Sequence, residues 1–331
     1  MGKSTRSFLI KLAGSAVILV LLFRFIDFDK QSFVVIFDKL NLPLYLLSLT
    51  GVALVLGIKS YRWHWIIRTE GHYYSPWKSF KAYMASFTIG VVTPGRIGEI
   101  ARLYYLREEV DIDFVPSFRT IVTDRIFDLG VLFMLSFAGL IYYGQIGIHE
   151  VYTAAAIGIG LFFLGLFLAA WLLKRLLATK KPDALRPLRF VQSCVDQAVS
   201  GKALLLWLIT LAAYLGFYGA IDLIFLSLGV SMPIIDIAII LSVVGLVSIL
   251  PISLAGFGTR EVSLVYLLAF YGITPELALS FSLLQFGAFF LWGGIIGLVF
   301  WFLMPISLDQ VKQDARAVKQ LLSKKKSSET I

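Results

Sequence analysis

Long apolar stretches alternate with short charged segments along most of this 331-residue chain. A helix needs about 20 apolar residues to cross the ~30 Å hydrocarbon core of a bilayer. Six stretches meet or approach that length: 8–26, 42–58, 120–143, 154–173, 203–228 and 277–304. The pattern therefore predicts an all-α polytopic membrane protein with about six full spans.

Two further apolar stretches are too short to cross. The first, 80–93, ends at Pro94-Gly95, and the second, 236–250, ends at Pro251 before another short run at 262–271. At ~1.5 Å per residue, arms of about 12 to 15 residues reach only about 18 to 22 Å. We expect two re-entrant helical hairpins that enter from opposite faces, with tips near the midplane. The alternative is a pair of Pro-kinked helices that cross fully.

Basic residues are concentrated in four segments, which the positive-inside rule places in the cytoplasm. These are the N-terminus, 59–78, 174–202 and the tail, whereas 144–153, 229–235 and 272–276 contain no Lys or Arg. We therefore expect both termini to be cytoplasmic in a multi-pass protein of the cell membrane. Residues 1–304 would form one transmembrane domain, and 305–331 a basic cytoplasmic tail.

The order span, span, hairpin, span occurs twice, at about 8–143 and again, in flipped orientation, at about 154–304. The two hairpin tips also resemble each other, since Pro94-Gly95-Arg96-Ile97-Gly98-Glu99 compares with Gly256-Phe257-Gly258-Thr259-Arg260-Glu261. Inverted repeats with Gly- or Pro-broken segments at matching positions point to a transporter site at the midplane. The sequence therefore predicts an inverted repeat around a central site.

Composition narrows the class of protein further. Hydrophobic types make up 58% of the chain and charged residues 15%, whereas a soluble domain is about a quarter charged. These values exclude a soluble enzyme, a disordered chain and, with Cys194 as the one cysteine, a disulfide scaffold. The net charge of +9 reads as an orientation signal and not as nucleic-acid binding. No metal or cofactor motif occurs, so we expect neither.

Several charged residues fall within the apolar stretches, where each central charge costs ~2.5 to 3.5 kcal/mol on insertion scales. Arg binds phosphate bidentately, and free N–H groups at a Gly-rich break add an anion site. Carboxylates could balance the arginines, bind a cationic headgroup or carry a coupled proton. The candidate substrate-binding residues are Pro94, Gly95, Arg96, Gly98, Glu99, Asp124, Arg125, Asp128, Asp222, Gly256, Gly258, Arg260 and Glu261. Mutually neutralised pairs such as Arg96–Glu99 are the structural alternative.

Three functions fit these features. The first is a transporter that moves a lipid with an anionic phosphate headgroup between leaflets. The second is an integral membrane transferase with Glu99 or Glu261 as general base, although the chain has no G-x-S-x-G or phosphate-loop motif. The third is a non-catalytic partner of a separate synthase or glycosyltransferase. We favour the transporter, which leaves no catalytic residue to assign; the oligomeric state is open.

Three motifs carry a resemblance to a known family: Thr93-Pro94-Gly95-Arg96-Ile97-Gly98-Glu99, Asp124-Arg125-Ile126-Phe127-Asp128, and Pro251 with Gly256-Phe257-Gly258-Thr259-Arg260-Glu261. They resemble signatures of the lysylphosphatidylglycerol synthase transmembrane-region family, also called flippase-like or UPF0104. The resemblance implies translocation of an aminoacylated phospholipid or of a polyprenyl-linked lipid, with the charged motif residues along the headgroup path. The soluble aminoacyl-transferase and glycosyltransferase domains of some members are not expected in these 331 residues.

Overall fold

Helices make up all the regular structure in the described part of the chain. The structure is a computed structural model that describes residues 24, 29–93, 98–143, 164–165, 168, 171–172, 175, 186–249 and 258–304. The first half contains α2 (Lys30–Asp38), α3 (Leu42–Thr69), α4 (Pro76–Val92), α5 (Ala101–Val110) and α6 (Phe114–Tyr143). The second contains α8 (Arg186–Val199), α9 (Ala203–Ser227), α10 (Ile234–Ile249), α11 (Thr259–Ala269), α12 (Pro275–Phe286), the π-helix η3 (Gly287–Trp292) and α13 (Gly293–Leu303).

Three of the helices begin at a polar capping residue that is followed closely by a proline. Asn41, Ser75 and Thr274 each accept a hydrogen bond from a backbone N–H in the first turn of α3, α4 and α12. A proline stands within the first two positions of each of these helices, where its missing N–H has no intrahelical partner to lose. A polar cap followed by proline therefore sets where these apolar segments begin.

Three helices in the described residues are long and apolar enough to cross a membrane. They are α3, α9 and the continuous Pro275–Leu303 unit formed by α12, η3 and α13. The last two match the predicted spans 203–228 and 277–304 closely. The predicted spans 8–26 and 154–173 and the tail fall almost wholly outside the described residues.

The predicted end of the second span at residue 58 is wrong. The helix α3 continues without a break to Thr69, and the side chain of Arg62 within it is completely buried. Hydropathy alone ends the span before Lys59, because a hydropathy scale treats every charged side chain as exposed to water. Here the charges are paired with carboxylates on another helix, so the segment stays inside the bundle.

The two interrupted stretches end where the sequence indicates. The helix α4 stops at Val92, and α10 is described as far as Ile249; each contacts the short helix that follows it, α5 or α11. The intervening tips, 94–97 and 250–257, lie outside the described residues. Re-entrant hairpins and the inverted repeat therefore stay predictions.

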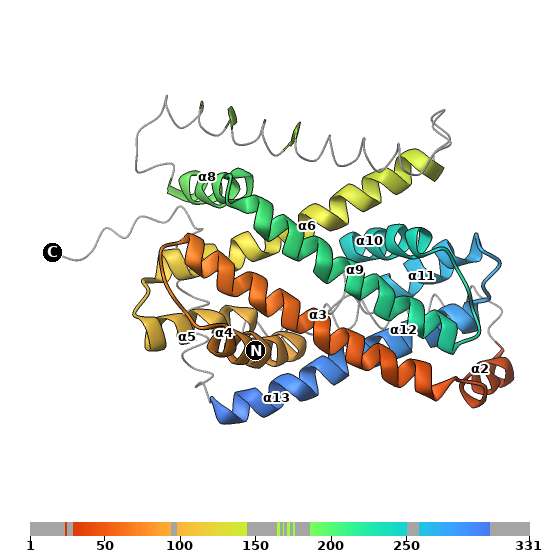
Figure 1. The fold of residues 1–331 in the computed structure, drawn as a ribbon. Helices are drawn as coiled ribbons and strands as arrows, with labels where there is room; N and C mark the ends of the chain where they lie inside the picture. The colour runs from red at the N-terminus through yellow and green to blue at the C-terminus, as the bar shows by residue number, and fades with distance from the viewer. Residues whose placement is uncertain are drawn as a thin grey trace, which may run out of the picture.

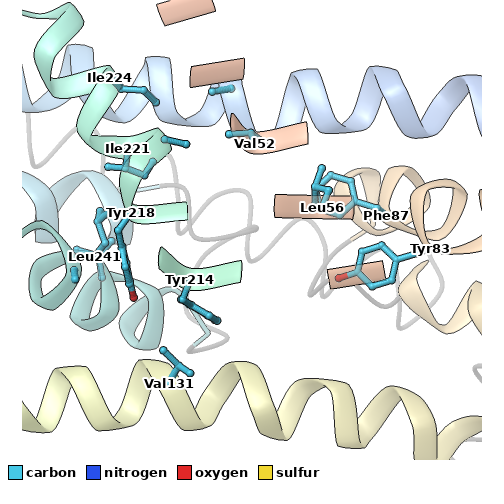
Figure 2. Close-up of a cluster of buried hydrophobic side chains, with 14 of the residues drawn as sticks. Val52, Leu56, Tyr83, Phe87, Val131, Tyr214, Tyr218, Ile221, Ile224 and Leu241 are labelled. Carbon is cyan, nitrogen blue, oxygen red and sulfur yellow. The ribbon is translucent and has the colours of Figure 1, made fainter. Parts of the chain in front are cut away.

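The helices α3 and α9 lie side by side along much of their length (Figure 1). They can approach closely at Gly51 because glycine has no side chain. A Cβ at this position would stand only 2.9 Å from the Cβ of Ala220. Figure 2 shows the apolar side chains around this pair, with Leu56 beside Phe87 of α4 and Tyr218 beside Leu241 of α10. Burial of these side chains holds α4, α6 and α10 around the central pair.

The helices α4 and α13 pack through a glycine face. A Cβ on Gly297 would overlap the carbonyl of Met84 and the hydroxyl of Thr88, and Thr88 donates a hydrogen bond to the Gly294 carbonyl at 2.7 Å. We predict that Gly297→Leu lowers stability by about 1 to 3 kcal/mol, because the helices must separate. Thermal unfolding in detergent measures the effect. Gly294→Ala is the matched control, since a Cβ there meets no atom within 4 Å; equal loss in both variants would contradict the packing account.

The amphipathic helix α8 lies on α6 and buries Cys194 completely. Burial raises the pKa of the Cys194 thiol to about 11. The raised pKa keeps the reactive thiolate scarce at neutral pH. We predict slow maleimide labelling of the folded protein at pH 7.5 and rapid labelling after denaturation. Labelling at the rate of a free thiol in the folded state would contradict this placement.

Candidate functional site

Seven charged side chains meet where α3, α5 and α6 come together next to α9. The cations are Lys59, Arg62, Arg102 and Arg125, and the carboxylates are Glu99, Asp124 and Asp128. We call these seven residues the charge network. The two aspartates are four residues apart on α6, so they share one helix face and point to the same neighbours.

Arg62 is the centre of the charge network. Its Nε and Nη2 donate to Asp124 Oδ1 at 3.0 and 2.7 Å, and its Nη1 donates to Asp128 Oδ1 at 2.9 Å. Nη1 also donates to the hydroxyl of Thr210 on α9 at 3.1 Å. One guanidinium with no exposed surface thus joins α3, α6 and α9.

Arg102 forms the second branch. It donates to the other oxygen of Asp124 at 3.0 Å and to Glu99 Oε2 at 3.0 Å. Its guanidinium carbon lies 4.7 Å from the ring centroid of Tyr83 and 5.4 Å from that of Trp63. Aromatic faces attract a desolvated guanidinium, so these rings help to stabilise Arg102 away from water.

Lys59 closes the third branch. Its Nζ lies 2.9 Å from Asp128 Oδ1 and 4.7 Å from the centroid of the Tyr214 ring. The Tyr214 hydroxyl donates to the Asp128 carbonyl at 3.3 Å. This branch brings a second side chain of α9 into contact with the network.

Arg125 is the most exposed member of the charge network. Its side chain is 34% exposed, whereas the other six range from 0 to 12%. Arg125 contacts the carboxylate of Glu99 and lies 3.6 Å from Asp128 Oδ2 and 3.8 Å from Asp124 Oδ2. Four cations here face three carboxylates, which leaves one positive charge in excess among the seven. The excess is accessible from outside at Arg125.

A second pair of charges, Arg260 and Glu261, lies on α11 and is not part of the charge network. Arg260 of α11 donates to Glu261 Oε1 through Nε at 3.0 Å, and also to the hydroxyl of Ser282 on α12 at 3.0 Å. Glu261 Oε2 accepts from the backbone N–H of Gly258 at 2.7 Å, at the start of α11. Gly258 has a φ of +87°, a conformation that L side chains rarely adopt. Here Glu261 completes the helix N-terminus and the two charges neutralise each other.

Residues 8–297 of the chain match the sequence family described as the lysylphosphatidylglycerol synthase TM region. The chain belongs to this family. It is also similar to a UPF0104 membrane protein of Methanocaldococcus jannaschii, with 22% identity over 92% of this chain and 98% of that protein. Membership confirms the predicted resemblance, and it places the chain among membrane proteins related to lipid handling.

The structure unites part of the predicted family motifs in one place. Glu99, Asp124, Arg125 and Asp128 come together in the charge network. Gly98 lies beside it, where a Cβ would overlap the backbone of Ile89. Arg260, Glu261 and Gly258 form the separate α11 group. Pro94, Gly95, Arg96 and Gly256 lie outside the described residues.

Asp222 is not brought into the charge network. It lies on α9, half-buried, twelve residues from Thr210, which corresponds to about 18 Å along the helix. Its place in an apolar helix suggested a shared site, but the helix rise separates it from the other carboxylates.

Sequence reasoning missed Lys59, Arg62 and Arg102. Lys59 and Arg62 were assigned to the basic cytoplasmic segment 59–78, and Arg102 was not among the candidate residues. One signal was present: Lys59 and Arg62 are three residues apart, so they share a helix face, and Asp124 and Asp128 share another. Matching pairs of opposite sign at helical spacing could have indicated that the two helices meet.

Proposed function

We propose that this protein is a flippase-like transporter that moves a lipid with an anionic phosphate headgroup between the leaflets of a membrane. The proposal is based on the excess positive charge among the seven described residues of the charge network, which is accessible at Arg125. Buried charges are costly unless they are paired. A phosphate at Arg125 would supply the missing negative charge.

The geometry around Arg125 suits exchange of partners. Glu99 Oε2 is shared between Arg125 and Arg102, so Arg125 can release Glu99 without leaving that carboxylate unpaired. The guanidinium can then bind two phosphate oxygens in its planar fork. Low exposure of the other six members keeps water away and strengthens this interaction. Headgroup binding would thus need one ion-pair exchange and no free buried charge.

The membrane arrangement is part of the proposal. We propose about six full spans, two re-entrant hairpins in an inverted repeat and cytoplasmic termini in the cell membrane. The length of α4, 17 residues, supports this arrangement because about 20 residues are needed to cross. The hairpins would act as alternating gates on either side of the charged region.

The family supports the choice of lipid. Its name refers to a synthase of lysylphosphatidylglycerol, an aminoacylated phospholipid. We propose a substrate of the aminoacyl-phospholipid or polyprenyl-linked type, which a separate synthase or glycosyltransferase would supply. Both types carry the phosphate that Arg125 would bind.

The experiment is leaflet exchange in proteoliposomes. Purified protein is reconstituted with a fluorescent phosphatidylglycerol, and a membrane-impermeant quencher reports the fraction accessible outside. We expect faster exchange than in protein-free vesicles. Exchange no faster than in those vesicles, together with a new lipid species by mass spectrometry in an expressing strain, would replace the transporter by the transferase.

A further inference from the structure

A groove of about 610 Å³ runs along the outer face of α3 and α9, away from the charge network. Its walls include Ala53, Gly57 and Tyr61 of α3, Phe80 of α4, and Ile209 and Ala212 of α9. The lining is almost entirely apolar. On α3 these residues are on a different side of the helix from Lys59 and Arg62, which point into the network.

The wall of the groove is hollow at Gly57, which has no side chain. A Cβ on Gly57 would meet no heavy atom within 4 Å, and neighbouring Leu54 is 65% exposed. This contrasts with Gly51 on the same helix, whose missing side chain is filled by Ala220. The hollow at Gly57 is therefore not used for contact between α3 and α9.

The surroundings of the groove determine what can fill it. Both α3 and α9 are apolar enough to cross a membrane. The groove follows α3 from Thr50 to Tyr61, which corresponds to about 16 Å at ~1.5 Å per residue. A hydrocarbon chain has the shape and the polarity for such a groove.

A basic residue, Arg68, lies beyond one end of the groove. Arg68 is seven residues beyond Tyr61, two helical turns along the same face of α3, and it is exposed. Its guanidinium carbon lies 4.8 Å from the centroid of the Trp65 ring and 5.9 Å from that of Tyr73. Among the described residues no carboxylate forms an ion pair with Arg68. Aromatic side chains next to a basic residue are typical of the membrane–water interface.

We propose that this face binds one anionic phospholipid, with an acyl chain in the groove and the phosphate at Arg68. The apolar groove matches the acyl chain of such a lipid, and the positive charge of Arg68 matches its phosphate. The site is separate from the charge network, because it uses the opposite side of the α3–α9 pair, and it does not rest on the proposed transport. The bound lipid would connect α3, α4 and α9 by filling the space between them.

Native mass spectrometry tests the proposal. Detergent-purified protein is titrated with phosphatidylglycerol and, separately, with phosphatidylcholine of the same chains. We expect tighter retention of phosphatidylglycerol by the wild type. Gly57→Leu should lower retention of both lipids about tenfold, because the new side chain enters the groove at a position where its Cβ meets no heavy atom within 4 Å. Arg68→Gln should remove the preference for phosphatidylglycerol while phosphatidylcholine retention is unchanged.

Two controls separate this site from the charge network and from folding. Gly219→Leu on α9 also enters open space, but Gly219 does not line the groove, so wild-type retention is expected. Gly57→Leu should reduce retention by the same factor in an Arg125→Gln background, since the sites are independent. Wild-type retention in Gly57→Leu would overturn the proposal. So would a change in monomer–dimer ratio without a change in lipid retention, which would make the groove a contact between copies.

Discussion

Arg62→Met is expected to destabilise the protein by about 3 to 5 kcal/mol, the range for removal of one partner from a buried ion pair. The substitution leaves Asp124 and Asp128 without the guanidinium that binds both, in a place with no exposed surface around Asp124. Thermal unfolding in detergent, followed by loss of helical circular dichroism, measures the change.

The matched control for Arg62 is Lys78→Met. Lys78 forms an ion pair with Glu109 at 2.9 Å, but its side chain is 50% exposed. Exposed pairs contribute about 0 to 1 kcal/mol, so this variant should unfold close to the wild type. A second variant, Arg62→Met with Asp124→Asn, should recover part of the loss because it removes one of the unpaired charges. Equal stability of Arg62→Met and Lys78→Met would show that the buried network is not formed.

Arg125→Gln is expected to reduce lipid translocation at least about tenfold while the fold is retained. Hydrogen bonds to charged groups contribute about 1.5 to 3 kcal/mol, and 1.4 kcal/mol corresponds to a factor of ten. Because Arg125 is 34% exposed, its removal disturbs packing less than removal of Arg62. The leaflet-exchange assay measures the rate, and size-exclusion chromatography checks the folded state.

Arg119 offers a matched control on the same helix. It is 30% exposed, forms an ion pair with Glu70 and is not part of the charge network. Arg119→Gln should therefore translocate lipid within about twofold of the wild type. Parallel losses in both variants would indicate a general effect of charge removal from α6 and would contradict a headgroup site at Arg125.

The sequence was most informative where burial is uniform. The stretch 203–228 corresponds to α9 (Ala203–Ser227), and 277–304 to the unit Pro275–Leu303, because continuous apolar runs have one stable environment in a membrane. The end of α4 at Val92 also follows from the sequence Thr93-Pro94-Gly95, which interrupts the helix. Local chemistry was enough for each of these features.

The charge network could not be derived in the same way, because its pairs are distant in sequence. Arg62 is 62 residues from Asp124 and 66 from Asp128. Hydropathy assigns such charges to loops, and only the three-dimensional contact shows that they are neutralised inside the bundle. The π-helix Gly287–Trp292 was not predicted for a related reason. It contacts α3, which is distant in sequence, and the Trp292 indole N–H donates to the Leu49 carbonyl at 3.2 Å.

In the α11 group the two charges contact each other, and a role for them in substrate binding stays a prediction. Arg260 and Glu261 were predicted as site residues, and the alternative was mutual neutralisation. Their contacts with each other, with Ser282 and with the Gly258 backbone fit the alternative in the described residues.

The most direct measurement is an experimental density map of the protein in nanodiscs that contain phosphatidylglycerol. We expect phosphate density within hydrogen-bond distance of the Arg125 guanidinium, with Arg62 still bound to Asp124 and Asp128. A map in which Arg125 contacts only protein carboxylates, with no lipid density near it, would show that Arg125 does not bind the headgroup.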